Sequence, residues 1–191
     1  MDTKKNLDLD HPMHEHIIEA GKIILNQGIV IFPAQCLYGV AANALDPKAV
    51  QKIFNIKQRP KNNPILVLIQ NKKDLKTLVK TIPAQAEILM DRFWPGSLTL
   101  VFKAADHVSP LLTANTGKIG IRVPGHPIAR ALVQQVQGPV TGTSANISGQ
   151  PGCCLVSTLP RALVQIIQSI HIRNTLIKWL IFSELFSGTV Q

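Results

Sequence analysis

Long apolar runs are absent from this sequence of 191 residues, and none reaches the ~20 residues that a membrane-spanning helix needs. The nearest candidate, TLIKWLIFSELF near the C-terminus, is interrupted by Lys178 and Glu184. The N-terminal stretch MDTKKNLDLDHPMHEHII mixes acidic and basic side chains, unlike a secretory signal peptide. We therefore expect a soluble, cytoplasmic protein that has no membrane partner.

Cysteine is also scarce, with only Cys36 and the adjacent pair Cys153 and Cys154. These three predict reduced thiols and no disulfide framework, and no second pair stands at the spacing of zinc ligands. The HPMHEH stretch does not match H-E-x-x-H, and neither a G-x-G-x-x-G nor a P-loop motif is present. The remaining histidines have no nucleophile or carboxylate at motif spacing. We predict neither a protein-held metal nor a catalytic triad.

Acidic residues are missing from a long stretch, since none lies between Asp106 and Glu184. The whole chain has 20 Lys and Arg against 11 Asp and Glu, a formal net charge of +9. Such a balance favours polyanionic partners such as nucleotides, RNA or acidic surfaces. An ordinary solvated basic surface is the alternative. The basic residues of the acid-free stretch are Lys118, Arg122, Arg130, Arg161, Arg173 and Lys178.

Helical and strand-like patterns alternate along the chain, which predicts an α/β sheet with helices on its faces and ligands outside the strand ends. The expected helices cover 15–28, 46–57, 73–79, 83–94 and 126–136, and the expected strands 29–33, 64–70, 98–104, 118–124 and 138–146. We expect one domain with a flexible N-terminal arm (1–14), a core (15–152) and a divergent C-terminal segment (153–191) that packs on the same domain.

The stretch IKQRPKNNPILVLI at 56–69 places Lys57, Arg59 and Lys61 directly before an apolar strand. Cations at the end of a helix are favoured by its dipole, so these charges could simply form a solvated loop. Alternatively they bind an anion, with Arg59 as a rigid fork for phosphate oxygens and Lys57 as a mobile point charge.

Two further segments carry polar side chains that suit a binding site. In GTSANISGQP at 142–151, Ser144 and Asn146 stand two apart in an extended segment and so face one side. They could read a ribose, a base or a carboxylate, or form a polar turn. Arg122 lies inside the apolar strand IRVP with few acidic residues near it in sequence, which favours an anion as its partner.

Taken in order, K-x-R-P (57–60), W-P-G-x-L-T (94–99), R-V-P-x-H-P (122–127) and S-A-N-x-S-G (144–149) resemble the YrdC/TsaC family of threonylcarbamoyl-AMP synthases. The resemblance covers about 15–152. It implies a twisted mixed sheet with flanking helices and a basic central cavity. It also implies a single-domain nucleotidyltransferase that makes L-threonylcarbamoyladenylate and pyrophosphate from L-threonine, bicarbonate or carbon dioxide, and ATP with Mg²⁺.

The same resemblance implies a role in the threonylcarbamoyl modification of tRNA, with threonylcarbamoyl-transferase proteins downstream and a possible RNA contact through the basic surface. Lys57 and Arg59 would be catalytic. The residues implied to bind ATP are Lys57, Arg59, Asn63, Lys118 and Asn146. Those implied to bind threonine are Cys36, Arg122 and Ser144, with Lys118 on the same wall.

The chain departs from the family pattern in two places. The usual P-T-[DE]-x segment reads Pro33, Ala34, Gln35 and Cys36, so a hydroxyl and an acid are missing. The Asp-Gly-Gly stretch and S-T-V-V-D strand that follow in the family have no clear match after Pro151. One alternative is therefore a YrdC-like module that binds nucleotide or RNA without turnover. Another is a relative that carbamoylates a different acceptor.

Overall fold

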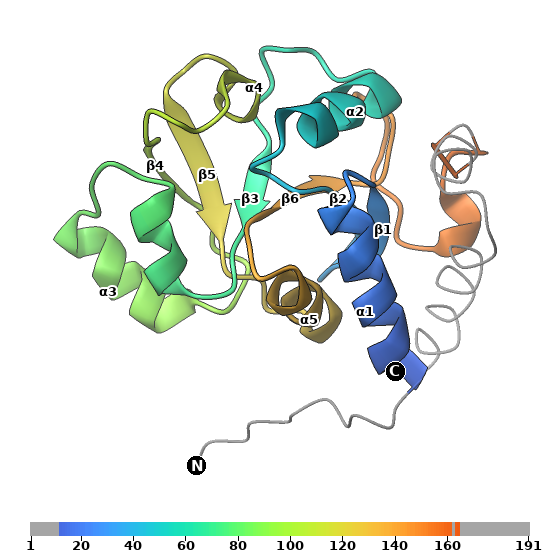
Figure 1. Cartoon of the computed structure of the whole chain (residues 1–191), viewed down its shortest axis with the longest axis horizontal. Coiled ribbons are helices and arrows are strands. Elements are labelled where there is room, and N and C mark those ends of the chain that lie inside the picture. Colours follow the sequence, from blue (N-terminus) through green and yellow to red (C-terminus); the bar gives the residue numbers. More distant parts are fainter. Residues whose placement is uncertain (1–11, 162, 165–191) are drawn as a thin grey trace.

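The computed structural model describes residues 12–161, 163 and 164 (Figure 1). Most of the predicted N-terminal arm and the C-terminal segment beyond Val164, including TLIKWLIFSELF, lie outside the described residues. The division of the chain into three segments therefore stays a prediction. Within the described part, no helix combines the length and hydropathy needed to cross a bilayer.

Six strands form one sheet in the order β1-β2-β6-β3-β5-β4. Among the described residues, the β3–β5 pair is parallel and the other neighbouring strands run antiparallel. This arrangement confirms the expected mixed α/β sheet. The strand bounds are β1 (Val30–Pro33), β2 (Tyr38–Ala41), β3 (Leu66–Leu68), β4 (Leu100–Lys103), β5 (Lys118–Arg122) and β6 (Val140–Ser144).

The helices begin and end close to the predicted positions. Asp46 caps the second of them by accepting hydrogen bonds from the backbone amides of Lys48 and Ala49, and Gln58 ends it in a left-handed conformation with φ of 49°. The bounds are α1 (Pro12–Leu25), α2 (Pro47–Lys57), η1 (Lys72–Thr77), α3 (Ala84–Phe93), α4 (Pro110–Thr113), α5 (Pro127–Val136) and η2 (Val156–Thr158).

Several elements differ from the predictions, and the short helices α4 and η2 were not predicted. The arm predicted to be loose is helical from Pro12, because proline suits the first turn of a helix. The stretch 38–41, which was assigned to no helix or strand, forms the strand β2. Glycine is uncommon inside strands, so Gly39 weakens the sequence pattern of β2. Glycine is needed there because a side chain would place its Cβ 2.7 Å from the Phe32 ring.

The sheet separates two hydrophobic clusters, as the alternation along β1 shows. Val30 and Phe32 pack with α1 and α5, whereas Ile31 packs with the cluster that includes α2. In Figure 1, α1 and α5 lie together, away from α2 and α4. The described start of the C-terminal segment joins the α2 cluster through Cys153, Leu159 and Leu163. The candidate site described next lies on the α5 side of the sheet.

Candidate functional site

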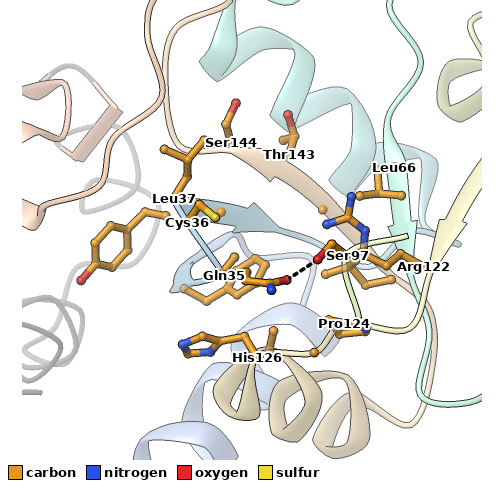
Figure 2. Close-up of a pocket in the computed structure, with 18 of the residues that line it drawn as sticks. Gln35, Cys36, Leu37, Leu66, Ser97, Arg122, Pro124, His126, Thr143 and Ser144 are labelled. Carbon is orange, nitrogen blue, oxygen red and sulfur yellow. Dashed lines mark hydrogen bonds between the residues drawn. The ribbon is translucent and has the colours of Figure 1, made fainter. Parts of the chain in front are cut away.

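A cavity of about 320 Å³ opens on the α5 side of the sheet (Figure 2). This volume is near the lower end of the roughly 300–1,000 Å³ typical of small-molecule sites. Its walls come from the β1–β2 turn, the ends of β5 and β6, the loop before β4 and the start of α5. The lining residues are Phe32, Ala34, Gln35, Cys36, Leu37, Tyr38, Gly39, Leu66, Leu68, Gly96, Ser97, Arg122, Pro124, Gly125, His126, Ala129, Gly142, Thr143 and Ser144.

Arg122 supplies the positive charge of this cavity. Its Nε and Nη2 both donate to the Thr99 hydroxyl, at 3.0 and 2.8 Å, and the side chain is half-buried. Burial lowers the pKa of Arg122, but a guanidinium stays charged at neutral pH. In the described part of the chain, the ion pairs are Lys72–Asp91 and Lys80–Asp106, so no carboxylate neutralises Arg122. A half-buried cation held only by a neutral hydroxyl suits an anionic ligand.

Neutral polar groups surround the same space. Ser144 and Thr143 lie at the end of β6, and Cys36 lies exposed in the β1–β2 turn. The Ser97 hydroxyl donates to Oε1 of Gln35 at 3.0 Å, shown as a dashed line in Figure 2. The three residues predicted to bind threonine, Cys36, Arg122 and Ser144, therefore line one cavity.

Lys57 occupies a different place from the one predicted. Its side chain is 0% exposed, and its Nζ donates to Asn146 O at 2.6 Å, to Asn146 Oδ1 at 3.0 Å and to the Ser144 carbonyl. The Lys57 carbonyl in turn accepts from the Ser148 amide at 2.9 Å. The description of Lys57 as a mobile point charge is therefore wrong, because every Nζ hydrogen can be used inside the protein. The contact joins two motifs that lie 87–89 residues apart.

Burial is also the main reason why the pKa of Lys57 falls from 10.5 to about 8. The nearby positive charge of Arg59 lowers this pKa further, and Cys153 raises it in part. Near neutral pH the amine is still protonated in most molecules. The lysine thus holds the end of β6 through charge-assisted hydrogen bonds.

Protein groups also engage both side-chain polar atoms of Asn146. Its Oδ1 accepts from Lys57 and from the Ser144 hydroxyl, and its Nδ2 donates to the Gln150 carbonyl. The chain bends directly after Ser144, so Asn146 does not continue the extended segment that the sequence suggested. For Asn146 the local geometry matches the alternative reading of a polar turn.

The other predicted ATP ligands lie outside the cavity. Arg59 donates from Nε to Asn63 O at 3.2 Å and from Nη2 to Pro64 O at 2.7 Å, which shapes the approach to β3. Burial lowers the pKa of Arg59, and the Asn63 side chain is exposed. Lys118 starts β5, four residues before Arg122, which at about 3.3 Å per residue puts it about 13 Å away along the strand. It shares the sheet face with Arg122 but does not share the wall of this cavity, which corrects the prediction.

The cavity also contains polar residues that the sequence analysis did not select, namely Gln35, Ser97, Thr143 and His126. Ser97 and His126 stand inside the W-P-G-x-L-T and R-V-P-x-H-P motifs, so the motifs themselves were the available signal. Burial lowers the pKa of His126, and its buried Nδ1 has no hydrogen-bond partner among the residues that the structure describes. The expected basic character of the cavity depends on Arg122, because the other described lining residues include no Lys or Arg.

Comparison with known proteins identifies relatives of this chain. The family model Sua5/YciO/YrdC, described as "Telomere recombination", matches residues 22–177. The threonylcarbamoyl-AMP synthase of Pyrococcus abyssi is 43% identical over 123 residues, which is 64% of this chain and 36% of the relative. The enzyme of that name from Bacillus subtilis is 38% identical over 152 residues, 79% of this chain and 43% of the relative.

A solved structure supports the same resemblance. The crystal structure of P. abyssi Sua5 complexed with L-threonine is similar to this chain with a TM-score of 0.73 and 39% sequence identity. The match covers 75% of this chain and 42% of that one. The chain thus spans less than half the length of these relatives. The family model, the two relatives and the solved structure agree with the family resemblance seen in the motifs. The solved structure also agrees with the twisted mixed sheet.

Proposed function

Because the chain belongs to the Sua5/YciO/YrdC family, we propose that it acts as a threonylcarbamoyl-AMP synthase. The reaction takes L-threonine, bicarbonate or carbon dioxide, and ATP, and yields L-threonylcarbamoyladenylate and pyrophosphate. The observation that carries this proposal is Arg122, a cation with no described acidic partner on the wall of a small cavity. A guanidinium in this position suits the carboxylate of an amino acid.

The side chains around Arg122 fit a reaction that depends on positioning. Ser144 and Thr143 offer hydroxyls to the polar groups of the amino acid. The threonine amine adds to carbon dioxide to give a carbamate, a carbamate oxygen attacks the α-phosphate of ATP, and pyrophosphate leaves. These steps need close approach and charge neutralisation more than proton transfer by the protein.

ATP needs more room than the cavity gives, so we place it beyond the rim. Arg59 is the candidate for its phosphates, since this half-buried cation keeps N–H donors free after its two bonds to backbone carbonyls. Asn63 is exposed beside it. Lys57 and Asn146 would act by holding the end of β6 in place, because their polar atoms are engaged with each other.

Mg²⁺ enters this proposal as the ion that accompanies the ATP phosphates. The described residues form no group of three His, Cys, Asp or Glu that could hold a metal ion, and Mg²⁺ commonly binds through substrate phosphates and water with few protein ligands. We therefore assign no step to the metal. The RNA contact, the downstream transferase partners and the cytoplasmic location expected from the sequence also stay predictions.

One observation favours the second candidate, a nucleotide-binding module without turnover. The side-chain polar atoms of the motif residues Lys57 and Asn146 are all engaged in protein contacts, which leaves fewer groups for the chemical step. The two candidates differ in pyrophosphate release from ATP, measured with and without L-threonine in bicarbonate and Mg²⁺. Threonine-dependent release supports the enzyme. ATP binding without such release would overturn the enzyme and leave the binding module.

A further inference from the structure

The cavity offers a ligand one fixed positive charge and, among the described residues, no negative one. Its nineteen lining residues include Arg122 but no Asp or Glu. Much of the remaining wall is apolar, with Phe32, Leu37, Leu66 and Leu68 among the lining residues. An amino acid brings both a carboxylate and an ammonium group into this space, and only the carboxylate finds a charged partner.

Gln35 lies on the exposed rim of the cavity and carries no charge. It follows β1 in the turn to β2, and its Oε1 accepts from the Ser97 hydroxyl at 3.0 Å (Figure 2). Ser97 occupies one of the two lone pairs of Oε1, so the amide offers a ligand two N–H donors, one remaining lone pair and no charge. An ammonium group has no lone pair with which to accept from the N–H donors, whereas an uncharged amine has one.

Two physical effects act on the amine of a ligand in this cavity, and both have the same sign. The apolar walls remove the water that stabilises an ammonium, which lowers the pKa of the amine. The positive charge of Arg122 repels the ammonium and lowers that pKa further. The other titratable lining residues are His126, Cys36 and Tyr38, and burial lowers the pKa of His126, which favours its neutral form. The neutral His126 and the Ser144 hydroxyl can accept a hydrogen bond from either form of the amine, so they do not replace a carboxylate. With no described carboxylate to oppose the two effects, the uncharged amine is the favoured form.

We infer that the cavity binds its amino-acid ligand with the α-amine uncharged and that the neutral side chain of Gln35 determines this preference. The inference rests on the proposed function, since it takes L-threonine as the ligand. On binding, one N–H bond of the ammonium breaks, its electron pair stays on nitrogen, and the proton passes to bulk solvent.

The uncharged amine is the form that reacts with carbon dioxide. Its lone pair forms the N–C bond while one C–O π pair moves to oxygen, and a second proton leaves the nitrogen to give the carbamate. Binding would thus prepare the nucleophile before ATP takes part, without a general base on the protein.

Isothermal titration calorimetry of L-threonine at about pH 7, in phosphate and in Tris, tests this inference, because the two buffers differ in ionisation enthalpy. We expect about one proton to be released per threonine bound, and the affinity to rise with pH by up to about tenfold per unit below the pKa of the free amine. An analogue without the amine, 2,3-dihydroxybutanoate, should release none.

The variant Gln35→Glu places a carboxylate at the rim, and Gln35→Met is its matched neutral control. Gln35 is exposed, so both variants should fold. Gln35→Glu should bind L-threonine with almost no proton release and little pH dependence, whereas Gln35→Met should keep the release. Wild-type binding without proton release, or equal release by the two variants, would overturn the inference alone. No L-threonine binding by any of the three proteins would overturn the proposed function as well.

Discussion

Lys57 and Arg122 are both cations in family motifs, yet they differ in burial and in how many protein groups they contact. Lys57 is 0% exposed and donates its Nζ hydrogens to Ser144 and Asn146. Arg122 is half-buried, and its side chain donates to the Thr99 hydroxyl as its one hydrogen-bond partner in the described part of the chain. The charge of Lys57 is used to build the site, and the charge of Arg122 remains available to a ligand. The comparison teaches that motif membership alone does not separate a positioning residue from a binding residue.

The largest effect should come from removing the buried cation. Lys57→Met leaves the Ser144 and Asn146 carbonyls without their donor, so we expect the free energy of unfolding to fall by about 3 kcal/mol. Urea denaturation at neutral pH measures it, with Lys61→Met as the control because Lys61 is exposed. Equal urea midpoints for the two variants would show that the Lys57 hydrogen bonds to Ser144 and Asn146 do not stabilise the fold.

The next effect is the pH dependence that Lys57 gives to stability. Its pKa is about 8 in the folded chain and 10.5 ordinarily, so the unfolded chain keeps the proton to higher pH. Stability therefore rises as pH increases from about 8 to 10.5. Relative to Lys57→Met, the free energy of unfolding of the wild type should rise by about 2 kcal/mol between pH 7 and 9.5. Denaturation curves of both proteins at these pH values would contradict this if their difference stayed constant.

Arg59 should show a smaller effect that is confined to one substrate. We expect Arg59→Gln to weaken ATP binding by about tenfold, because one charge-assisted contact to phosphate is lost. L-threonine binding should be unchanged, since Arg59 does not line the cavity. Calorimetry with each ligand measures both quantities, and Lys61→Gln serves as the exposed neighbour. Equal weakening of both ligands would place Arg59 among the residues that shape the whole site.

The smallest effect belongs to Lys118. It is exposed at the end of β5 away from the cavity, beside Lys103 on the paired strand. We expect Lys118→Gln to change the affinity for ATP and for L-threonine by less than about twofold, as for other exposed surface charges. A tenfold loss of ATP affinity would restore its predicted role and show that ATP extends along β5.

The sequence predicted the parts of this structure that depend on local patterns. The Asp46–Pro47 start of α2 and the buried strands follow from capping and apolar runs. The family resemblance also predicted residues that meet around one cavity, namely Cys36, Arg122 and Ser144. In each case the deciding information lies within a few neighbouring residues or in a recognisable motif.

The remaining features depend on contacts between distant segments. Nothing near Lys57 in sequence shows that its Nζ ends among backbone carbonyls 87–89 residues away, because backbone acceptors leave no pattern of side chains. The strand β2 escaped prediction because the Phe32 ring requires glycine at position 39, and glycine weakens a strand pattern. The bend after Ser144 likewise depends on the hydrogen bonds of Asn146 with Ser144 and Gln150, which the sequence pattern does not show.

The central claim is that Arg122, and not Lys57, provides the charge that a ligand meets. Calorimetric titration of L-threonine into Arg122→Gln tests it most directly, with Arg130→Gln as the control because Arg130 is exposed on α5 outside the cavity. We predict that affinity falls by about 100-fold in Arg122→Gln, with the loss of a charge-assisted pair, and is unchanged in Arg130→Gln. Unchanged affinity in Arg122→Gln would contradict the account.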